Sequence, residues 1–297
     1  MNENVKFLVT CDSACDMPRE LLDSIEAYVI PFEYSGKIEN KDEIFVDSMH
    51  TEDYKIFYDN MKKGVVYKTS QINIDRYMDF FNGLKDKGLP ILHISLTNAL
   101  SSTIENAQYV AKELAKEGMD IRVIDGKIAS LGLGLLINKA CKARDNGLSI
   151  DEAVKEVENI SNNLGVFYTT STLKYFARGG RLSKTSSIIA AALKINIVLD
   201  CEKDGKLRTI AKCHGRNKAK RFIADHIKES ALDPKNHVIY VCASDCKDEA
   251  IKYAAELVKE IGFKYYCLTD MGPIIGSHAG PGLIAVFYET KECIRWY

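Results

Sequence analysis

Small polar residues and glycines gather at three places where predicted strands give way to the next element. Thr69 and Ser70 follow a short apolar run, residues 97–102 precede a predicted helix, and residues 277–282 read SHAGPG. In an open α/β sheet, ligands bind outside the carboxyl ends of the strands, and a helix N-terminus at that edge offers free N–H groups. These segments therefore predict a binding site for an anion.

Four side chains in or near these segments suit a carboxylate or a phosphate. The hydroxyls of Thr69 and Ser101 can hydrogen-bond an anion, and Arg181, in the run RGGR (178–181), offers a fork of donors. His278 lies among glycines that permit a tight turn, where an imidazole can donate to an anion or titrate near neutrality. Each residue also has a purely structural interpretation: Ser101 as a helix cap, Arg181 as a surface arginine and His278 as a loop histidine.

The motifs of nucleotide-binding proteins and hydrolases are missing from the sequence. Each of three Gly-Lys pairs is followed by Ile or Leu, so none forms a Walker phosphate loop. Gly132 and Gly134 lack the third glycine of a dinucleotide fingerprint, and we expect close helix packing there. Neither H-E-x-x-H nor G-x-S-x-G occurs, and Ser171 with Lys174 matches only the commonplace S-x-x-K pattern.

The composition excludes several classes of protein. The 297 residues include 40 Lys and Arg against 41 Asp and Glu, which argues against a strongly basic nucleic-acid binder. No apolar run reaches the length of about 18 residues typical of a membrane span, and no signal peptide is recognisable, so we expect a cytoplasmic protein without a transmembrane segment. The nine cysteines have no C-x-x-C spacing, and we expect reduced thiols and no structural metal.

Short β-branched runs alternate with helical stretches, which predicts an α/β fold of two domains spanning residues 1–162 and 163–297. The first should hold a mainly parallel sheet with flanking helices. The second should hold a mixed sheet with helices, because the turn at 202–206 predicts a hairpin. The strands are expected at 5–10, 27–32, 89–95, 121–125, 166–169, 195–199, 207–213, 238–243, 265–269 and 283–288.

Three helices are well marked by apolar residues at spacings of three and four. They cover residues 104–115, 149–160 and 248–261. Ser101 or Ser102 can cap the first, with Ser102 and Glu105 fitting a capping box, and Ser149 with Glu152 fits the second. The basic segment 212–221 is interpreted as a solvated helix face, or alternatively as a docking surface for an acidic partner or a phosphate.

Six ordered blocks of the sequence resemble the DegV family of bacterial fatty-acid-binding proteins along nearly the whole chain. They are TCDSACDMP (10–18), TSQ (69–71), LTNALSST (96–103), VIDGKIASLGLG (123–134), YFARGGRLSK (175–184) and HAGPG (278–282). The resemblance implies two α/β domains with a long apolar tunnel between them. The tunnel would hold a long-chain fatty acid whose carboxylate lies at the domain interface.

The family pattern also implies roles for individual residues. Thr69, Ser101, Arg181 and His278 would bind the fatty-acid carboxylate, Ser70, Thr97 and Ser13 would supply additional contacts, and Arg216 would serve a partner protein. The family's proteins do not catalyse a reaction alone. The resemblance implies presentation of the lipid, for phospholipid metabolism, to a separate ATP-dependent fatty acid kinase that supplies nucleotide and Mg²⁺. No cofactor, metal or catalytic residue is then expected in this chain.

The sequence departs from the family pattern at several positions, which affects the expected loop shape and acyl-chain preference. Ile72 and Asn73 stand where Pro and Ser are usual, Ser102 replaces a Gly, and Cys11 replaces a Thr.

Two other functions stay open at this point. One is a stand-alone enzyme for a small carboxylate or phosphate, with His278 as acid or base and Ser101 or Cys11 as nucleophile. The other is a ligand-sensing protein, although nothing resembles a DNA-reading motif.

Overall fold

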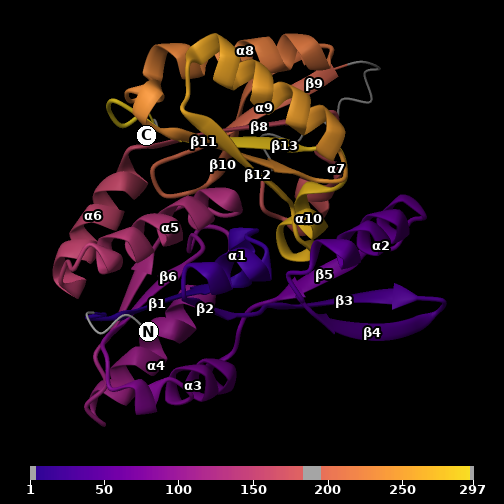
Figure 1. Cartoon of the computed structure of the whole chain (residues 1–297). Coiled ribbons are helices and arrows are strands. Elements are labelled where there is room, and N and C mark those ends of the chain that lie inside the picture. The colour runs from indigo at the N-terminus through magenta and orange to yellow at the C-terminus, as the bar shows by residue number, and fades with distance from the viewer. Residues whose placement is uncertain (1–4, 183–194, 295–297) are drawn as a thin grey trace.

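The computed structural model describes residues 5–182 and 195–294, which form two α/β domains (Figure 1). This confirms the predicted fold class. The amino-terminal domain contains a four-stranded sheet in the order β2-β1-β6-β7, in which every neighbouring pair is parallel. Its strands are β1 (Leu8–Asp12), β2 (Ala27–Ile30), β6 (Ile91–Ser95) and β7 (Ile121–Asp125).

Helices cover both faces of this sheet, with α1 and α5 above it and α3 and α4 below it in Figure 1. Every residue of the central strands β1 and β6 is buried, as expected for parallel strands covered on both sides. The helices are α1 (Arg19–Ser24), α3 (Ile74–Asn82), α4 (Thr103–Ala115), α5 (Leu131–Asp145) and α6 (Ile150–Asn162), with short 3-10 turns η1 (Ser13–Cys15) and η2 (Lys85–Lys87).

The carboxyl-terminal domain contains a six-stranded mixed sheet in the order β10-β9-β8-β13-β11-β12. Only β11 and β12 are parallel neighbours; the other pairs are antiparallel. Its strands are β8 (Leu164–Thr170), β9 (Ile195–Cys201), β10 (Leu207–His214), β11 (Val238–Ala243), β12 (Tyr265–Asp270) and β13 (Ile284–Glu289). Its helices are α7 (Lys174–Gly179), α8 (Arg216–Ser230), α9 (Lys247–Ile261) and α10 (Pro273–Ala279), with the 3-10 turn η4 (Pro234–Asn236).

A third, three-stranded sheet projects from the amino-terminal domain next to α10 (Figure 1). Its antiparallel order is β4-β3-β5, with β3 (Glu33–Ile38), β4 (Lys41–Val46) and β5 (Tyr67–Ser70), and α2 (Thr51–Lys62) supplies the helix. Tyr34 and Tyr67 of the sheet pack on Phe57 of α2, and Phe45 packs on both tyrosines, with ring-centroid distances of 4.6–6.3 Å among these four residues. Aromatic packing therefore fixes β5, the strand that carries Thr69.

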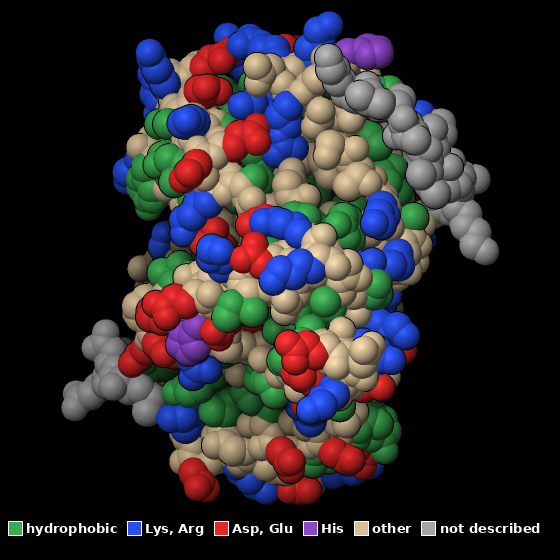
Figure 2. All heavy atoms as spheres, turned by 90° about the vertical axis from the view of Figure 1, so that its right-hand side faces the viewer, with side chains coloured by type: hydrophobic (Ala, Val, Ile, Leu, Met, Phe, Trp, Pro, Cys, Tyr) green, Lys and Arg blue, Asp and Glu red, His purple; other side chains and the backbone are tan. Residues whose placement is uncertain are grey.

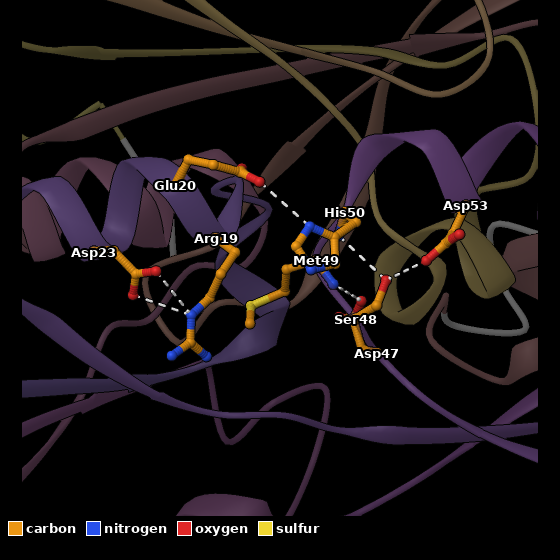
Figure 3. Close-up of polar contacts among 8 residues, drawn as sticks. All are labelled: Arg19, Glu20, Asp23, Asp47, Ser48, Met49, His50 and Asp53. Atoms are coloured by element: carbon orange, nitrogen blue, oxygen red, sulfur yellow. Dashed lines mark hydrogen bonds and ion pairs between the residues drawn. The ribbon is translucent and has the colours of Figure 1, made fainter.

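Short polar contacts fasten the start of α2 to α1 (Figure 3). The Ser48 hydroxyl donates to Asp53 Oδ2 at 2.7 Å, and His50 Nδ1 lies 3.3 Å from Glu20 Oε1. The backbone N–H of Met49 donates to Asp47 Oδ1, and the backbone N–H of Arg19 donates to the Met49 carbonyl. These contacts hold the three-stranded sheet in place relative to the amino-terminal domain.

A continuous hydrophobic core joins the two domains. Helix α5 packs on β11 and β13 as well as on β1, so residues of both sheets share this core. A Cβ atom at Gly132 would lie 2.6 Å from Phe287 Cδ1, and one at Gly134 would lie 2.7 Å from Met17 Cγ. The two glycines thus serve close packing, as predicted.

Most predicted strands form, with ends that differ by a few residues. The largest shift is in β1, predicted at 5–10 and found at Leu8–Asp12, because its pairing with β2 and β6 continues to the residues before the 3-10 turn. The expected hairpin at 202–206 joins β9 and β10, with Gly205 at φ +87°. The strands β3 and β4 were missed, and Thr69 and Ser70 lie within β5 rather than after a strand.

The capping box predicted at Ser149 and Glu152 is confirmed, whereas the one at Ser102 and Glu105 is wrong. Ser102 has φ −72° and ψ 11°, which turns its side chain away from the capping position; Ser101 Oγ instead accepts a bond from the Thr103 N–H at 3.3 Å.

The basic segment 212–221 is only partly a helix face. Residues 212–214 belong to β10, and α8 begins at Arg216.

The ends of the elements support a domain boundary between residues 162 and 163, which we propose because α6 ends at Asn162 and the six-stranded sheet starts with Leu164. Within residues 5–182 and 195–294, no helix combines the length and apolar character needed to cross a membrane.

Candidate functional site

A cavity of about 410 Å³ lies between the two domains, within the size range of small-molecule sites. Most of its wall is apolar, and polar side chains are concentrated on β5, on the loop before α4, after α7 and on α10. It is lined by Phe32, Thr69, Ser70, Gln71, Leu96, Asn98, Ala99, Leu100, Ser101, Ser102, Ala129, Ser130, Tyr168, Phe176, Arg181, Leu207, Met271, Ile274, Ile275, His278, Ala279 and Leu283.

Thr69 and His278 connect the two domains at this cavity. Thr69 comes from β5 and His278 from α10, 209 positions later, and Thr69 Oγ1 lies 2.8 Å from His278 Nε2. This bond sets the orientation of both groups. When Nε2 carries the proton, His278 donates to Thr69 Oγ1 and the threonine hydroxyl is free to donate to an oxygen of an anion.

The ring of His278 packs directly against Gly179. A Cβ atom at Gly179 would collide with His278 Nδ1, so only glycine fits under the ring. Nδ1 is buried and has no hydrogen-bond partner among the described residues. Burial is the largest cause, and together with the charges of Arg181 and Arg178 it lowers the pKa of His278 to about 4.

We expect His278 to stay neutral in the ligand-free protein at every pH above about 4. A titration of the ring followed by ¹⁵N NMR measures this pKa directly. A ring that titrates near 6.5, the ordinary value for histidine, would contradict the burial and the cationic surroundings that the structure gives it.

Ser101 is presented by a short loop that begins at the end of β6. The N–H groups of Leu100 and Ser101 both donate to the Thr97 carbonyl, which closes the loop into a turn. Asp12 supports its base by accepting from Ser95 Oγ and the Leu96 N–H, each at 2.9 Å. Burial raises the pKa of Asp12 to about 6.

Arg181 closes the polar end of the cavity from the carboxyl-terminal domain. Its Nε donates to the Leu100 carbonyl at 3.2 Å, and its Nη1 donates to the Gly179 carbonyl at 2.6 Å. The first bond joins Arg181 to the loop that carries Ser101. The guanidinium is therefore held beside both Ser101 and His278, where it can offset the charge of an anion.

The structure brings five of the predicted residues to the cavity: Thr69, Ser70, Ser101, Arg181 and His278. Two others lie outside its lining. Thr97 Oγ1 donates to the Asp204 carbonyl, and Ser13 Oγ accepts from the Phe32 N–H.

Arg216 lies at the start of α8 and outside the cavity lining. Its Nε donates to Glu249 Oε1 and its Nη1 to the Thr169 carbonyl, each at 3.0 Å.

Cys11 also lies outside the cavity lining, which separates it from the other proposed catalytic groups. It is completely buried in β1. A hydrogen bond with Cys15 and burial both raise the pKa of the Cys11 thiol well above its ordinary value. A protonated, inaccessible thiol is a poor nucleophile.

Ser130, which was not predicted as a site residue, lines the cavity at the N-cap position of α5 with φ +59°. The only signal was its place in the block at 123–134. Among residues 5–182 and 195–294, no three His, Cys, Asp or Glu side chains are arranged to hold a metal ion. The lining of the cavity combines an arginine, several hydroxyls and an imidazole, which can bind an anion, with a larger number of apolar side chains.

The chain is similar to proteins of one known family along nearly its whole length. The family model described as "uncharacterised protein, DegV family" matches residues 6–291. A DegV domain-containing protein of Clostridium perfringens is 31% identical over 293 residues, which cover 97% of this chain and 99% of the relative. One from Caldanaerobacter subterraneus is 32% identical over 289 residues, covering 96% and 99%.

Solved structures are similar over nearly their whole length. A structure described as a DegV lipid binding protein from Thermotoga maritima has a TM-score of 0.85 at 23% identity, covering 97% of this chain and 99% of that one. Another, described as showing fatty acid binding of a DegV family protein from Thermus thermophilus, has a TM-score of 0.84 at 22% identity, covering 96% and 99%. At these identities the likeness establishes a shared fold.

Proposed function

The chain belongs to the DegV family, and on that premise we propose that it binds a long-chain fatty acid in the cavity between its domains. The carboxylate would contact Thr69, Ser101, Arg181 and His278, and the acyl chain would occupy the apolar part. The observation that carries this proposal is the Thr69–His278 contact beside Arg181, in a cavity whose other lining side chains are mostly apolar. Ser70 would add a contact at the edge, whereas Thr97 and Ser13 would support the loops behind it.

The free energy of burying a fatty acid is consistent with a cavity that offers both apolar and polar side chains. Burying a sixteen-carbon chain at about 0.8 kcal/mol per CH₂ offers on the order of 12 kcal/mol before the costs of association. A carboxylate removed from water without partners would cost several kcal/mol. The hydroxyls and the guanidinium at one end are therefore required for a fatty acid to bind in a single direction.

We further propose that the chain is a lipid-binding subunit rather than an enzyme, and that it presents the fatty acid to a separate ATP-dependent fatty acid kinase in the bacterial cytoplasm. A carboxylate oxygen would attack the terminal phosphorus of ATP, the bond to the ADP oxygen would break, and an acyl phosphate would form for phospholipid synthesis. The family pattern supports this step, with nucleotide and Mg²⁺ coming from the kinase. Arg216, a quarter or less exposed and paired with Glu249, would stabilise the surface on which that partner docks.

Extraction of the purified protein under denaturing conditions, followed by mass spectrometry, tests the binding proposal. We expect a near-stoichiometric fatty acid from protein purified from a bacterial host, and its chain length reports the length of the occupied cavity. Protein that is empty and also fails to bind added fatty acids would contradict the proposal. A stand-alone enzyme using His278 would then become the leading alternative.

A further inference from the structure

Two further cations, Lys174 and Arg178, lie on the helix that precedes Arg181, outside the lining of the cavity, and the carboxylate of a fatty acid does not account for them. Lys174 is the first residue of α7. Arg178 lies in the last turn of the same helix, three residues before Arg181. Both are exposed. On the face of the molecule that Figure 2 shows, Lys and Arg side chains lie at mid-height with Asp and Glu side chains among them.

The ring of Tyr175 holds these two cations in position. Arg178 Cζ lies 5.2 Å from the ring centroid and Lys174 Nζ lies 5.7 Å from it, both within the range of a cation–π contact. Tyr175 in turn packs against Gly280, where a Cβ atom would collide with the ring. Because Gly280 follows α10, the cations on α7 are fixed relative to His278.

The electrostatic surroundings of His278 are positive. The two charged groups that shift its pKa are Arg181 and Arg178, and both lower it. In the part of the chain that the structure describes, Lys174, Arg178 and Arg181 form no ion pair with an acidic side chain. Arg178 is thus close enough to the site to act on His278, and its charge is not neutralised by a carboxylate there.

A fatty acid carries a single negative charge, which Arg181 alone can offset. A phosphoryl group carries up to two charges at pH 7 and three acceptor oxygens. We infer that Arg178, assisted by Lys174, binds the phosphoryl group at the mouth of the cavity, so that this end of the site is built for a dianion as well as for a carboxylate. This inference rests on the proposed function and deepens it by assigning the phosphate-binding side chains.

Two ligands with the same chain length but different head groups distinguish phosphoryl binding by Arg178 from binding of the acyl chain. Binding of hexadecanoate and of hexadecylphosphonate is measured for the wild type and for Arg178→Gln, after removal of any resident lipid. We expect the variant to bind the phosphonate about three- to tenfold more weakly, as for an exposed charge-assisted contact. Hexadecanoate should change by less than about twofold, since Arg178 does not line the cavity.

Further variants separate phosphate binding from a structural role of the residue. Lys174→Gln should give the same preference with a smaller effect, and Arg178→Lys should restore part of the phosphonate affinity. Arg221→Gln, an exposed arginine on α8, should change neither affinity. If Arg178 only stabilised the end of α7, both ligands would weaken equally, and that result would overturn the inference.

The phosphate could reach these cations on the acyl chain or on a nucleotide. Adding tripolyphosphate to protein loaded with hexadecanoate distinguishes the two sources. Binding that depends on Arg178 points to the donor's terminal phosphate, and Arg178-dependent binding of the phosphonate alone points to the acyl phosphate. Absence of both effects contradicts the inference, whereas a wild type that binds neither lipid contradicts the proposed function itself.

Discussion

Replacing Thr69 and Ser101 together by Ala should weaken fatty-acid binding by about a hundredfold or more. Each hydroxyl lines the polar end of the cavity, and hydrogen bonds to a charged group contribute about 1.5–3 kcal/mol each. Loss of two such bonds corresponds to about 3–6 kcal/mol, at 1.4 kcal/mol per factor of ten in affinity. Titration with a fluorescent fatty acid, and the lipid retained through purification, measure the effect.

The double variant should remain folded, because neither hydroxyl is part of the buried core. Ser101 Oγ accepts one bond from the Thr103 N–H, and Thr69 Oγ1 is bonded to His278 Nε2. Loss of a cap of this kind costs about 1 kcal/mol of stability. Thermal unfolding in the absence of lipid checks that the loss of binding is not a loss of structure.

Matched variants show whether the hydroxyl itself is responsible. Thr69→Ser keeps the hydroxyl on β5 and should bind nearly as the wild type does. Thr97→Ala removes a neighbouring hydroxyl that bonds to the Asp204 carbonyl and lies outside the lining, so it should retain lipid. An unchanged lipid load in the double variant would remove Thr69 and Ser101 from the binding site.

Two strands, one almost fully buried and one only partly buried, have the ends predicted from their β-branched runs. β7 and β11 have the predicted ends, and β11 is a β-branched, nearly fully buried run. β3 and β4 were missed because their residues alternate between one face packed on α2 and one open face that carries Ser35, Lys37 and Ile44. Their aromatic core forms only when α2 folds over them, so neither strand has a strong pattern of its own.

Site residues were predictable from the sequence where a small polar residue or a histidine lies close to the end of a predicted strand or helix. Thr69, Ser101 and His278 met this condition, although the contact between Thr69 and His278 joins positions 209 apart and has no local signal. Ser130 was missed because its role depends on a backbone φ of +59°, which is uncommon outside glycine. Its partner is Asp16, 114 positions earlier, so the structure was needed to reveal their contact.

Asp16 joins the cavity wall to both domains through one carboxyl group. Its Oδ2 accepts from Ser130 Oγ at 2.5 Å, and its Oδ1 accepts from the Gly272 N–H at 2.9 Å, at the start of the helix that carries His278. Cys242 Sγ on β11 lies 3.6 Å from Oδ2. Burial raises the pKa of Asp16 from 3.8 to about 8, although the bonds from Ser130 and Gly272 act in the opposite direction.

This raised pKa has a definite consequence for stability. Between about pH 4 and pH 8 the folded protein holds a proton on Asp16 that the unfolded chain has released, so the free energy of unfolding falls as the pH rises. Asp12 and Asp47, with pKa values raised to about 6, act with the same sign but only up to about that pH. His278 acts with the opposite sign between about 4 and 6.5, where the unfolded chain alone is protonated.

The interval from about pH 6.5 to 8 therefore isolates Asp16 among these groups. We expect the midpoint of urea unfolding of the wild type to fall across this interval, and Asp16→Asn to remove most of that fall. One pKa unit corresponds to about 1.4 kcal/mol, so the part of the shift lying within this interval amounts to about 2 kcal/mol. Because an amide, like a protonated carboxyl, both accepts and donates, the variant can keep bonds to Gly272 and Ser130.

Asp47→Asn is the matched control, because Asp47 is also buried but titrates lower, and its side chain accepts from the Met49 N–H within the amino-terminal domain. It should change the pH dependence below about 6 and leave the slope between 6.5 and 8 intact. If Asp16→Asn kept the wild-type slope in that interval, Asp16 would be ionised in the folded protein. The junction of Ser130 with the start of α10 would then hold a buried charge, and the fall in stability due to Asp16 would be complete below pH 6.5.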